Sequence, residues 1–321
     1  MSWSRFIALK FLVSIMILAS GSAFSQGYPN KPIRIVTGAA GGGGDFAARL
    51  IAPELSGNLG QPVITENRGG NASIPAQIVK QAPPDGYTML LIANSFWLLP
   101  LLQAVPYDPV GDFLPITLVA SAPNILVVHF SVAANSVKEL IALAKARPGA
   151  LNYGSGTTGA INHLAAELFN AMARVNIVRI PYKGSAPALN ALLADQVQLM
   201  FATAATVAPH VKSGRLRSLA VTSAQPSALA PGVPTIAASG LPGYESESVY
   251  GVFAPAKTLA TLINRLNREM VRVLNSTDVK EKLFTTGAES VGSSPEQFAA
   301  AVKSDMAKMG KVIRDAGIRA E

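Results

Sequence analysis

The chain has 321 residues, no cysteine, three histidines and a formal net charge of +8. This length suits two domains with separate hydrophobic cores, and the lack of cysteine excludes a disulfide framework. Lysine and arginine are scattered singly, without a basic tract or interleaved aromatic residues, which argues against a nucleic-acid-binding protein. The mild positive charge instead favours acidic small molecules as ligands.

Residues 1–25 have the pattern of a secretory signal peptide. Arg5 and Lys10 give a basic start, residues 11–19 form an apolar run too short to span a bilayer, and small residues occupy the two positions that a signal peptidase reads. We expect a mature chain that begins at Gln26 and is soluble in the periplasm. Loss of the two basic residues lowers its net charge from +8 to +6. A retained membrane anchor is the alternative.

Strand-like and helix-like segments alternate along the rest of the chain. The expected strands cover 33–37, 63–66, 87–93, 151–153, 177–181 and 197–201. The expected helices cover 45–56, a segment ending near 81, a segment through 168, and 189–193. One more helix is expected to begin at a capping box from Ser136 to Glu139 and to stop at Pro148. This alternation predicts an α/β fold in which mostly parallel sheets are flanked by helices.

The C-terminal part is expected to be mostly helical. Apolar residues recur at helical spacing from Leu259 to Leu274, which is typical of a helix with one buried face. Ser294, Pro295 and Gln297 predict the start of the last helix, with a capping serine, a first-turn proline and a capping-box glutamine.

A run of glycines lies between the first strand and the first helix. Gly41, Gly42 and Gly43 let backbone N–H groups approach a ligand, and the helix N-terminus behind them favours an anion. Asp45 is expected to cap that helix. On this interpretation, Gly43→Val abolishes ligand binding and leaves the fold intact, because a branched side chain would occupy the place of the anion.

Two other interpretations of the same glycines remain open. Gly42, Gly44 and Ala47 fit a loose dinucleotide-binding fingerprint, and Glu66 stands near the distance expected of a ribose-binding acid. A dinucleotide-dependent oxidoreductase is therefore the alternative from a different functional class, although nicotinamide cofactors are not expected in an exported protein. A purely structural turn is the third interpretation.

Two further polar loops connect a strand to a helix. Ser155, Gly156, Thr157 and Thr158 could bind a carboxylate through amides and hydroxyls, or one threonine could simply cap the helix. In the third loop, Tyr182 precedes Lys183, which could supply positive charge to an anion or could be a solvated turn residue.

The patterns of common catalytic sites are missing. There is no phosphate-binding P-loop and no zinc-binding helix, and Ser155 lacks the preceding glycine of a nucleophile elbow. His163 is expected to form hydrogen bonds at a helix start rather than to bind a metal. The sequence therefore predicts a binding protein without a cofactor, not an enzyme.

At this point the residues resemble a known family. From Tyr28 to Glu321 the chain is similar to the Bug-type, or TctC-like, binding proteins of tripartite tricarboxylate transporters. The resemblance rests on motifs in fixed order: Tyr28-Pro29, Lys31-Pro32-Ile33, Gly41-Gly42-Gly43-Gly44-Asp45, Ala48-Arg49, Leu59-Gly60-Gln61-Pro62-Val63, Glu66-Asn67-Arg68, Pro84-Asp85-Gly86-Tyr87-Thr88, Tyr107-Asp108-Pro109, Asp112-Phe113, Asn152-Tyr153-Gly154-Ser155-Gly156, His163-Leu164-Ala165, Pro181-Tyr182-Lys183-Gly184, Gly240-Leu241-Pro242-Gly243-Tyr244 and Tyr250-Gly251.

The resemblance implies a two-lobed type II periplasmic binding fold, with residues 26–124 and 248–321 in lobe 1 and residues 125–247 in lobe 2. It implies a small carboxylate ligand held between the lobes by amides and hydroxyls, partly through water. The implied partners are a large and a small integral-membrane subunit, driven by an ion gradient and without an ATPase, or in some members a membrane-bound sensor. A monomer is expected. The candidate ligand-binding residues are Gly41, Gly42, Gly43, Asp45, Asn94, Ser95, Ser155, Gly156, Thr157, Thr158, His163, Tyr182, Lys183 and Thr203.

Two positions depart from the pattern of the family. Ala202-Thr203 stand where many relatives have Asp-Asn, and Phe96-Trp97 follow Asn94-Ser95 where relatives carry small, polar residues. If Phe96 and Trp97 face the cleft, the ligand is expected to have an apolar or aromatic body, and the missing aspartate argues against an ammonium group. Ordinary core packing of the two aromatic residues is the alternative.

Overall fold

The computed structural model describes residues 27–69, 72–156, 158–182 and 184–318, so the expected signal peptide lies outside the described residues. The helices and strands, in chain order, are β1 (Ile33–Thr37), α2 (Gly43–Leu59), β2 (Val63–Asn67), α3 (Ser73–Lys80), β3 (Thr88–Ala93), α4 (Ser95–Leu98), the 3-10 turn η2 (Leu99–Leu101), β4 (Phe113–His129), α5 (Val137–Ala146), β5 (Asn152–Ser155), α6 (Ile161–Ala173), β6 (Val178–Pro181), α7 (Ser185–Leu193), β7 (Leu199–Thr203), α8 (Ala204–Lys212), β8 (Leu216–Val221), β9 (Glu247–Pro255), α9 (Ala260–Leu274), α10 (Thr277–Thr285), β10 (Glu289–Ser290) and α11 (Pro295–Asp315).

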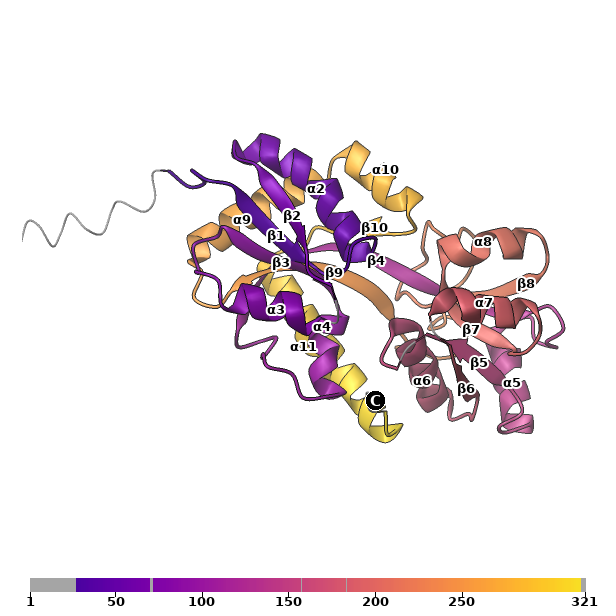
Figure 1. Cartoon of the computed structure of the whole chain (residues 1–321). Coiled ribbons are helices and arrows are strands. Elements are labelled where there is room, and N and C mark those ends of the chain that lie inside the picture. Colours follow the sequence, from indigo (N-terminus) through magenta and orange to yellow (C-terminus); the bar gives the residue numbers. More distant parts are fainter. Residues whose placement is uncertain (1–26, 70–71, 157, 183, 319–321) are drawn as a thin grey trace, which may run out of the picture.

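The chain forms two bodies joined by long strands (Figure 1). We call lobe 1 the body built on strands in the order β2-β1-β3-β9-β4, and lobe 2 the body in which β4 continues beside β7, β5 and β6. Strands β1, β2 and β3 pair in parallel, as do β5, β6 and β7, whereas β9 and β4 run antiparallel to their neighbours. The predicted α/β class with mostly parallel sheets is confirmed.

Strand β4 belongs to both lobes. Its residues up to Pro123 pair with β9, and those from Asn124 onward pair with β7, so the partner strand changes between two consecutive residues. The chain re-enters lobe 1 at Glu247, the first residue of β9 and the register partner of Pro123. The two connections between the lobes therefore lie side by side at one point.

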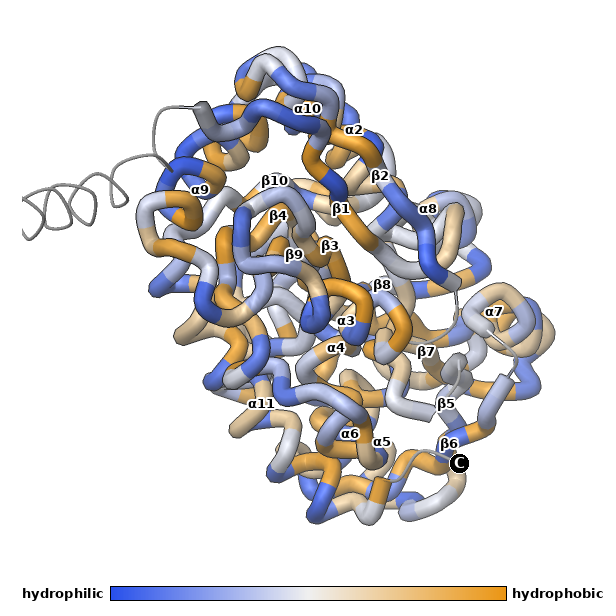
Figure 2. Tube along the Cα trace, turned by 60° about the vertical axis from the view of Figure 1, so that its left-hand side comes forward, coloured by the Kyte–Doolittle hydropathy of each residue, from blue (hydrophilic) through white to orange (hydrophobic). Residues whose placement is uncertain are grey.

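Helices cover both faces of the lobe 1 sheet. α2, α9 and α10 pack together over one face, and α3, α4 and α11 lie over the other (Figure 1). Along α9, hydrophobic and hydrophilic segments alternate as expected of a helix with one face on a sheet (Figure 2). Ile263, Leu266 and Met270 of that helix are buried, whereas Leu259 at its start is exposed, so the predicted apolar face is one residue shorter than expected.

Helix α11 also reaches lobe 2. It packs against α6, and its C-terminal end lies beside that helix in Figure 1. Buried residues of α11 such as Val312 and Ile313 belong to the same hydrophobic cluster as Leu168 and Phe169 of α6. The apolar core is therefore continuous between the lobes on this side of the molecule.

The alternation of segments in the sequence predicted most of these elements. Each expected strand is present with ends within two residues, and the Ser294 side chain caps α11 with the predicted capping box. Ser136 caps α5 as predicted, but Glu139 accepts a hydrogen bond from the Asn135 backbone instead of completing a box with Ser136. The long strand β4 and strands β8, β9 and β10 were not predicted.

Candidate functional site

The first glycine loop runs from the end of β1 into α2. The helix begins at Gly43, with Gly42 as its N-cap and no side-chain cap among the described residues. Asp45 lies inside the first turn, so the prediction that it caps α2 is wrong. Its carboxylate instead accepts hydrogen bonds from the Gly41 backbone N–H (2.9 Å), the Asn67 side chain (2.8 Å) and the Arg49 guanidinium (2.8 Å).

These contacts make Asp45 a support for the loop. Burial by itself raises the pKa of this carboxyl. The hydrogen bonds from Gly41 and Asn67 and the charge of Arg49 lower the pKa by more than burial raises it, so the pKa lies below its ordinary value. Asp45 is thus ionised at neutral pH, and its charge is matched by Arg49. Asn67 also donates to the Gly38 carbonyl, which fixes the loop at both ends.

A cavity of about 230 Å³ opens beside this loop. The predicted residues Gly42, Gly43, Asp45 and Ser95 line it. Gly41 is not among its lining residues, although it belongs to the same loop. The full lining consists of Thr37, Gly38, Ala39, Gly42, Gly43, Gly44, Asp45, Ala72, Ile92, Ala93, Ser95 and Tyr250. The cavity is therefore made of small residues, backbone at a helix N-terminus and a few polar side chains, the surroundings that suit a small anion.

Gly43 lies against a tyrosine as well as the cavity. A Cβ at this position would overlap the hydroxyl and ring of Tyr250, which lines the same cavity. Gly43→Val would therefore have to displace the Tyr250 side chain, and the expectation that it acts on ligand binding alone stays a prediction.

The aromatic residues after Ser95 belong to the core. Phe96 is 0% exposed and stacks on Tyr107 at 4.9 Å between ring centroids, and Trp97 is 1% exposed and packs edge-on against Phe253 and Phe298. The Trp97 indole N–H donates to Asp305 of α11 at 2.8 Å. The hypothesis that both residues make the cleft less polar is wrong, because α4 turns them away from the first glycine loop and into the face of the sheet covered by α11.

Asn94 anchors the start of α4, whose first residue is Ser95. Its backbone N–H donates to the Val249 carbonyl and its side-chain amide donates to the Glu247 carbonyl (2.9 Å), both on β9. Asn94 is 2% exposed, and its side-chain oxygen has no partner among the described residues. Ser95 itself is exposed at the first cavity.

The second loop is held by an arginine that the sequence analysis missed. Arg179 of β6 donates from Nε to the Ser155 hydroxyl (2.8 Å), from Nη1 to the Thr158 hydroxyl (3.1 Å) and from Nη2 to the Gly156 carbonyl (3.0 Å). The Ser155 side chain is completely buried and donates to the Gly156 carbonyl at 3.3 Å. The buried Ser155 side chain therefore holds the conformation of this loop. Thr157 lies outside the described residues.

His163 closes the second loop from α6. Its Nδ1 accepts the Gly159 backbone N–H at 3.1 Å, in agreement with the predicted hydrogen-bonding role at a helix start. Burial and the nearby Arg179 charge lower the pKa of His163 to about 4, so the imidazole is neutral at pH 7. His163, Thr158, Glu167 and Arg179 line a polar cavity of about 240 Å³ together with residues 316–318.

The third loop and Thr203 contribute less. The Tyr182 N–H donates to the Ser155 carbonyl, which joins the third loop to the second, while Lys183 lies outside the described residues. The Thr203 hydroxyl pairs with that of Thr206 at 2.7 Å. Neither Tyr182 nor Thr203 lines a cavity described above.

Five buried side-chain atoms in the described part of the chain have no hydrogen-bond partner. They are Thr37 Oγ1 at the end of β1, Asn94 Oδ1 after β3, Asn124 Nδ2 at the partner switch in β4, Ser223 Oγ after β8 and Glu269 Oε2 of α9. Because buried polar groups normally find partners, the Thr37 hydroxyl, which lines the first cavity, is available to water or a ligand there.

The structure argues against the dinucleotide interpretation. Glu66 forms ion pairs with both Arg34 (2.6 Å) and Arg68, and although burial raises its pKa, the hydrogen bonds from these arginines bring it below its ordinary value. The carboxylate expected to bind a ribose is therefore already engaged.

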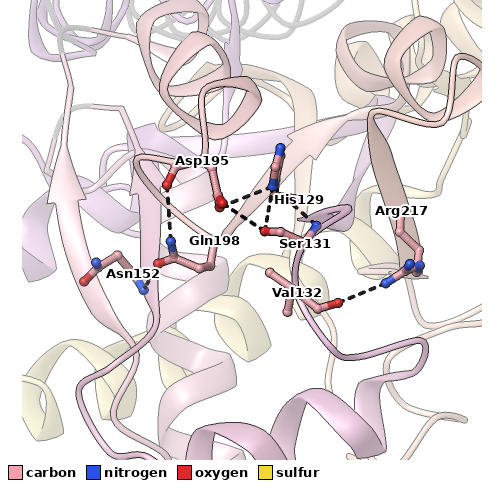
Figure 3. Close-up of polar contacts among 7 residues, drawn as sticks. All are labelled: His129, Ser131, Val132, Asn152, Asp195, Gln198 and Arg217. Atoms are coloured by element: carbon pink, nitrogen blue, oxygen red, sulfur yellow. Dashed lines mark hydrogen bonds and ion pairs between the residues drawn. The ribbon is translucent and has the colours of Figure 1, made fainter.

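A serine, a histidine and an aspartate meet at the far end of β4 (Figure 3). Ser131 Oγ lies 2.8 Å and Asp195 Oδ1 3.2 Å from the same ring nitrogen, Nδ1 of His129, and Ser131 also donates to Asp195. A catalytic triad needs the serine and the acid on opposite nitrogens of the histidine. This arrangement is therefore a structural network that closes the end of lobe 2.

Comparison with known proteins identifies the family. Residues 47–318 match the sequence profile of the "Tripartite tricarboxylate transporter family receptor". The chain belongs to this family. Receptors of this family are solute-binding proteins, and the resemblance noted in the sequence is confirmed.

Individual relatives share the length and the fold of this receptor. Protein BugT of Bordetella pertussis is 34% identical over 327 residues, which cover 99% of either chain. The solved structure of R. palustris Rpa4515 with adipate is 36% identical with a TM-score of 0.74, and covers 92% of this chain and 100% of its own. MatC from Rhodopseudomonas palustris with bound malate is 27% identical with a TM-score of 0.70, and covers 89% and 100%. The two-lobed periplasmic binding fold is confirmed.

The residues that the structure describes contain neither a membrane-spanning helix nor a metal-binding cluster. None of the helices there has the length and hydropathy needed to cross a membrane. Nor do three or more histidine, aspartate or glutamate side chains come together there in an arrangement suited to a metal ion.

Proposed function

We propose that this chain is a periplasmic receptor that binds a small aliphatic carboxylate between its two lobes and delivers it to the membrane subunits of a tripartite tricarboxylate transporter. Gln26 is the proposed start of the mature protein, after cleavage of a signal peptide. We also propose that lobe 1 covers residues 26–124 and 248–321 and that lobe 2 covers 125–247, which the change of strand partner at Asn124 supports.

The first glycine loop carries this proposal. Gly42, Gly43 and Gly44 at the N-terminus of α2 line a cavity of about 230 Å³ beside the ends of β1 and β3, and the backbone N–H groups of a first helical turn have no acceptor within the helix. A helix N-terminus attracts negative charge, and this volume lies just below the range of about 300–1,000 Å³ of typical drug-sized ligand sites. A small anion fits both the charge and the size.

The lining of the cavity limits the ligand further. Asp45 is its only charged side chain among the described residues, and its oxygens already accept three hydrogen bonds, so an ammonium group would find no free carboxylate there. Ile92, Ala72 and Ala93 offer apolar surface in place of the aromatic residues that the sequence suggested. The adipate and malate of the two relatives have this chemistry, an aliphatic body with carboxylates and no ammonium.

A single copy of the chain is sufficient for this function. The two loops that the family resemblance assigns to the ligand, the first glycine loop and the loop of Ser155 to Thr158, come from two lobes of the same chain, and the lobes are connected by β4 and β9. We therefore propose a monomeric receptor.

Thermal unfolding of the purified mature chain tests the proposal. Adipate, malate, citrate, benzoate, glutamate, aspartate and NAD are added in separate titrations, and calorimetry gives the affinity of each ligand that raises the melting temperature. A ligand that binds the native state stabilises it, so we expect a rise with adipate or malate and none with NAD. Binding of glutamate or aspartate alone would refute the predicted ligand class, and stabilisation by NAD alone would refute the proposed function.

A further inference from the structure

Arg179 is engaged with the second loop through three of its five donors. A guanidinium carries five N–H groups, and those of Arg179 that bond to Ser155, Gly156 and Thr158 account for three of them. The side chain is half-buried, and the remaining two N–H groups have no acceptor among the described residues. The arginine can therefore hold the loop and still bind an anion.

The charge of Arg179 is not compensated by an ion pair. None of the described carboxylates lies within 4 Å of it, in contrast to Asp45 in the first loop, which is paired with Arg49. Glu167, the acid that lines the same cavity, accepts the Tyr153 hydroxyl at 2.5 Å instead. His163 beside it is neutral at pH 7. The two loops thus differ in their charges. Asp45 at the first loop forms an ion pair with Arg49, whereas Arg179 at the second loop has no ion-pair partner among the described residues.

The cavity at Arg179 is shared between the lobes. Thr158, His163, Glu167 and Arg179 form its lobe 2 side, and residues 316–318 after α11 form its lobe 1 side. Arg179 therefore faces a cavity with walls from both lobes, so an anion bound there would contact both.

We propose that Arg179 is the residue by which lobe 2 selects an anionic ligand. It holds the second loop in its binding shape and supplies the positive charge that a ligand carboxylate offsets. This inference rests on the proposed carboxylate-binding function and assigns the charge selectivity to one side chain. A carboxylate meets backbone dipoles at the first loop and a full positive charge at the second.

Calorimetric titration of the mature chain with adipate and with malate, at several NaCl concentrations, tests the role of Arg179. R179Q removes the charge, and we expect at least about tenfold weaker binding with a shallower dependence on salt, because a charge-assisted contact is lost. R179K keeps the charge and loses the fork of donors, so we expect an intermediate affinity with the salt dependence of the wild type. The salt dependence of the affinity reports the loss of the charge, whereas a change in the shape of the loop alone would leave that salt dependence unchanged.

Arg217 supplies the matched control. It is a half-buried arginine of lobe 2 that also holds a loop. Its Nη1 donates to the Val132 carbonyl (3.1 Å), as Figure 3 shows, and to the Ala134 carbonyl (3.0 Å). R217Q removes the same charge and a similar clamp, and we expect its affinity to stay within about twofold of the wild type. Equal losses in R179Q and R217Q would overturn the proposal.

Glu167 tests the charge without disturbing the contacts of Arg179, which matters if R179Q does not fold. E167Q keeps an acceptor for Tyr153 and removes the negative charge beside the guanidinium, so carboxylate binding should tighten about two- to fivefold. Weaker binding in E167Q, or wild-type affinity and salt dependence in R179Q, would overturn the role of Arg179. Failure of the wild type to bind any carboxylate would instead overturn the proposed function.

Discussion

At the scale of single residues, charged side chains support the binding loops from behind. Asp45 in lobe 1 and Arg179 in lobe 2 each make three hydrogen bonds to or beside a glycine loop. Such contacts fix the loop in one conformation before the ligand arrives, which reduces the ordering cost of binding. The polar residues of the glycine loops are thus divided between those that face the cavity and those that hold the loop.

Two glycines of α2 allow a direct test of the role of Gly43. Gly43→Ala should destabilise the protein by about 1–3 kcal/mol, because the new methyl group overlaps Tyr250 and forces it out of the cavity wall. Gly57→Ala is the control: no atom lies within 4 Å of its added methyl group, so the better helix former should stabilise by about 0.5–1 kcal/mol. Urea unfolding of the two variants measures both changes. Equal effects in the two variants would show that Tyr250 is not the obstacle.

At the scale of elements, β9 and α11 contribute acidic residues to a cavity beside the connection between the lobes. Glu247 of β9 and Asp305 of α11 line a cavity of about 310 Å³ with Asn94, Ser121 and Lys308. Burial, and then the charges of Glu245 and Glu289, raise the pKa of Glu247 to about 7, while Ser121 and Lys308 oppose this rise. Burial also raises the pKa of Asp305. The interlobe connection therefore has a half-buried carboxyl, that of Glu247, whose pKa is about 7.

Glu247 should make the stability depend on pH with a definite sign. Its pKa is about 7 in the folded protein and 4.5 ordinarily, so between these values the folded state holds a proton that the unfolded chain has lost. The free energy of unfolding should therefore fall as the pH rises from 4.5 to 7, by at most about 3 kcal/mol. Glu247→Gln should remove this fall.

Urea unfolding at pH 4.5, 5.5, 6.5 and 7.5 measures the effect of Glu247→Gln. The control is Glu281→Gln, which removes an exposed carboxyl of α10. The Glu247→Gln variant should lose less stability than the wild type and the control over this range. Parallel pH profiles in all three proteins would contradict the role assigned to Glu247.

At the scale of the whole molecule, the two lobes share one core on the side of α11. The cluster that contains Phe253 and Phe298 of lobe 1 also contains Phe169 and Phe201 of lobe 2. Separate clusters lie under α2 and α9 in lobe 1 and under α7 and α8 in lobe 2. The shared cluster should make the lobes unfold together.

Scanning calorimetry should therefore show one transition, with equal calorimetric and van't Hoff enthalpies. Leu283→Ala in the cluster of lobe 1 and Leu192→Ala in that of lobe 2 should each lower the stability by about 2–5 kcal/mol, and each should move the whole transition. If either variant splits the transition into two, the lobes unfold independently and the shared core does not couple them.

The sequence by itself determined the local structure and the family. Alternating periods of apolar residues give the strands and helices, and the capping chemistry of Ser136 and Ser294 marks two helix starts. The positions of the three polar loops follow from the same pattern, because each lies between a strand and a helix. These features depend on residues close together in the chain, so their signal is complete within a short segment.

Tertiary structure alone decided which side chains meet. Phe96 and Trp97 follow a cavity residue and yet are buried, because their partners Phe253 and Asp305 lie more than 150 residues away. Arg179 on β6 contacts Ser155 on the neighbouring strand β5. Tyr250 contacts Gly43 from β9, which follows the whole of lobe 2 in the sequence, whereas Gly43 precedes it. Such contacts depend on strand order and on the side of the sheet that a residue faces, and a local pattern of polar and apolar residues carries no information about which distant segment will be the neighbour.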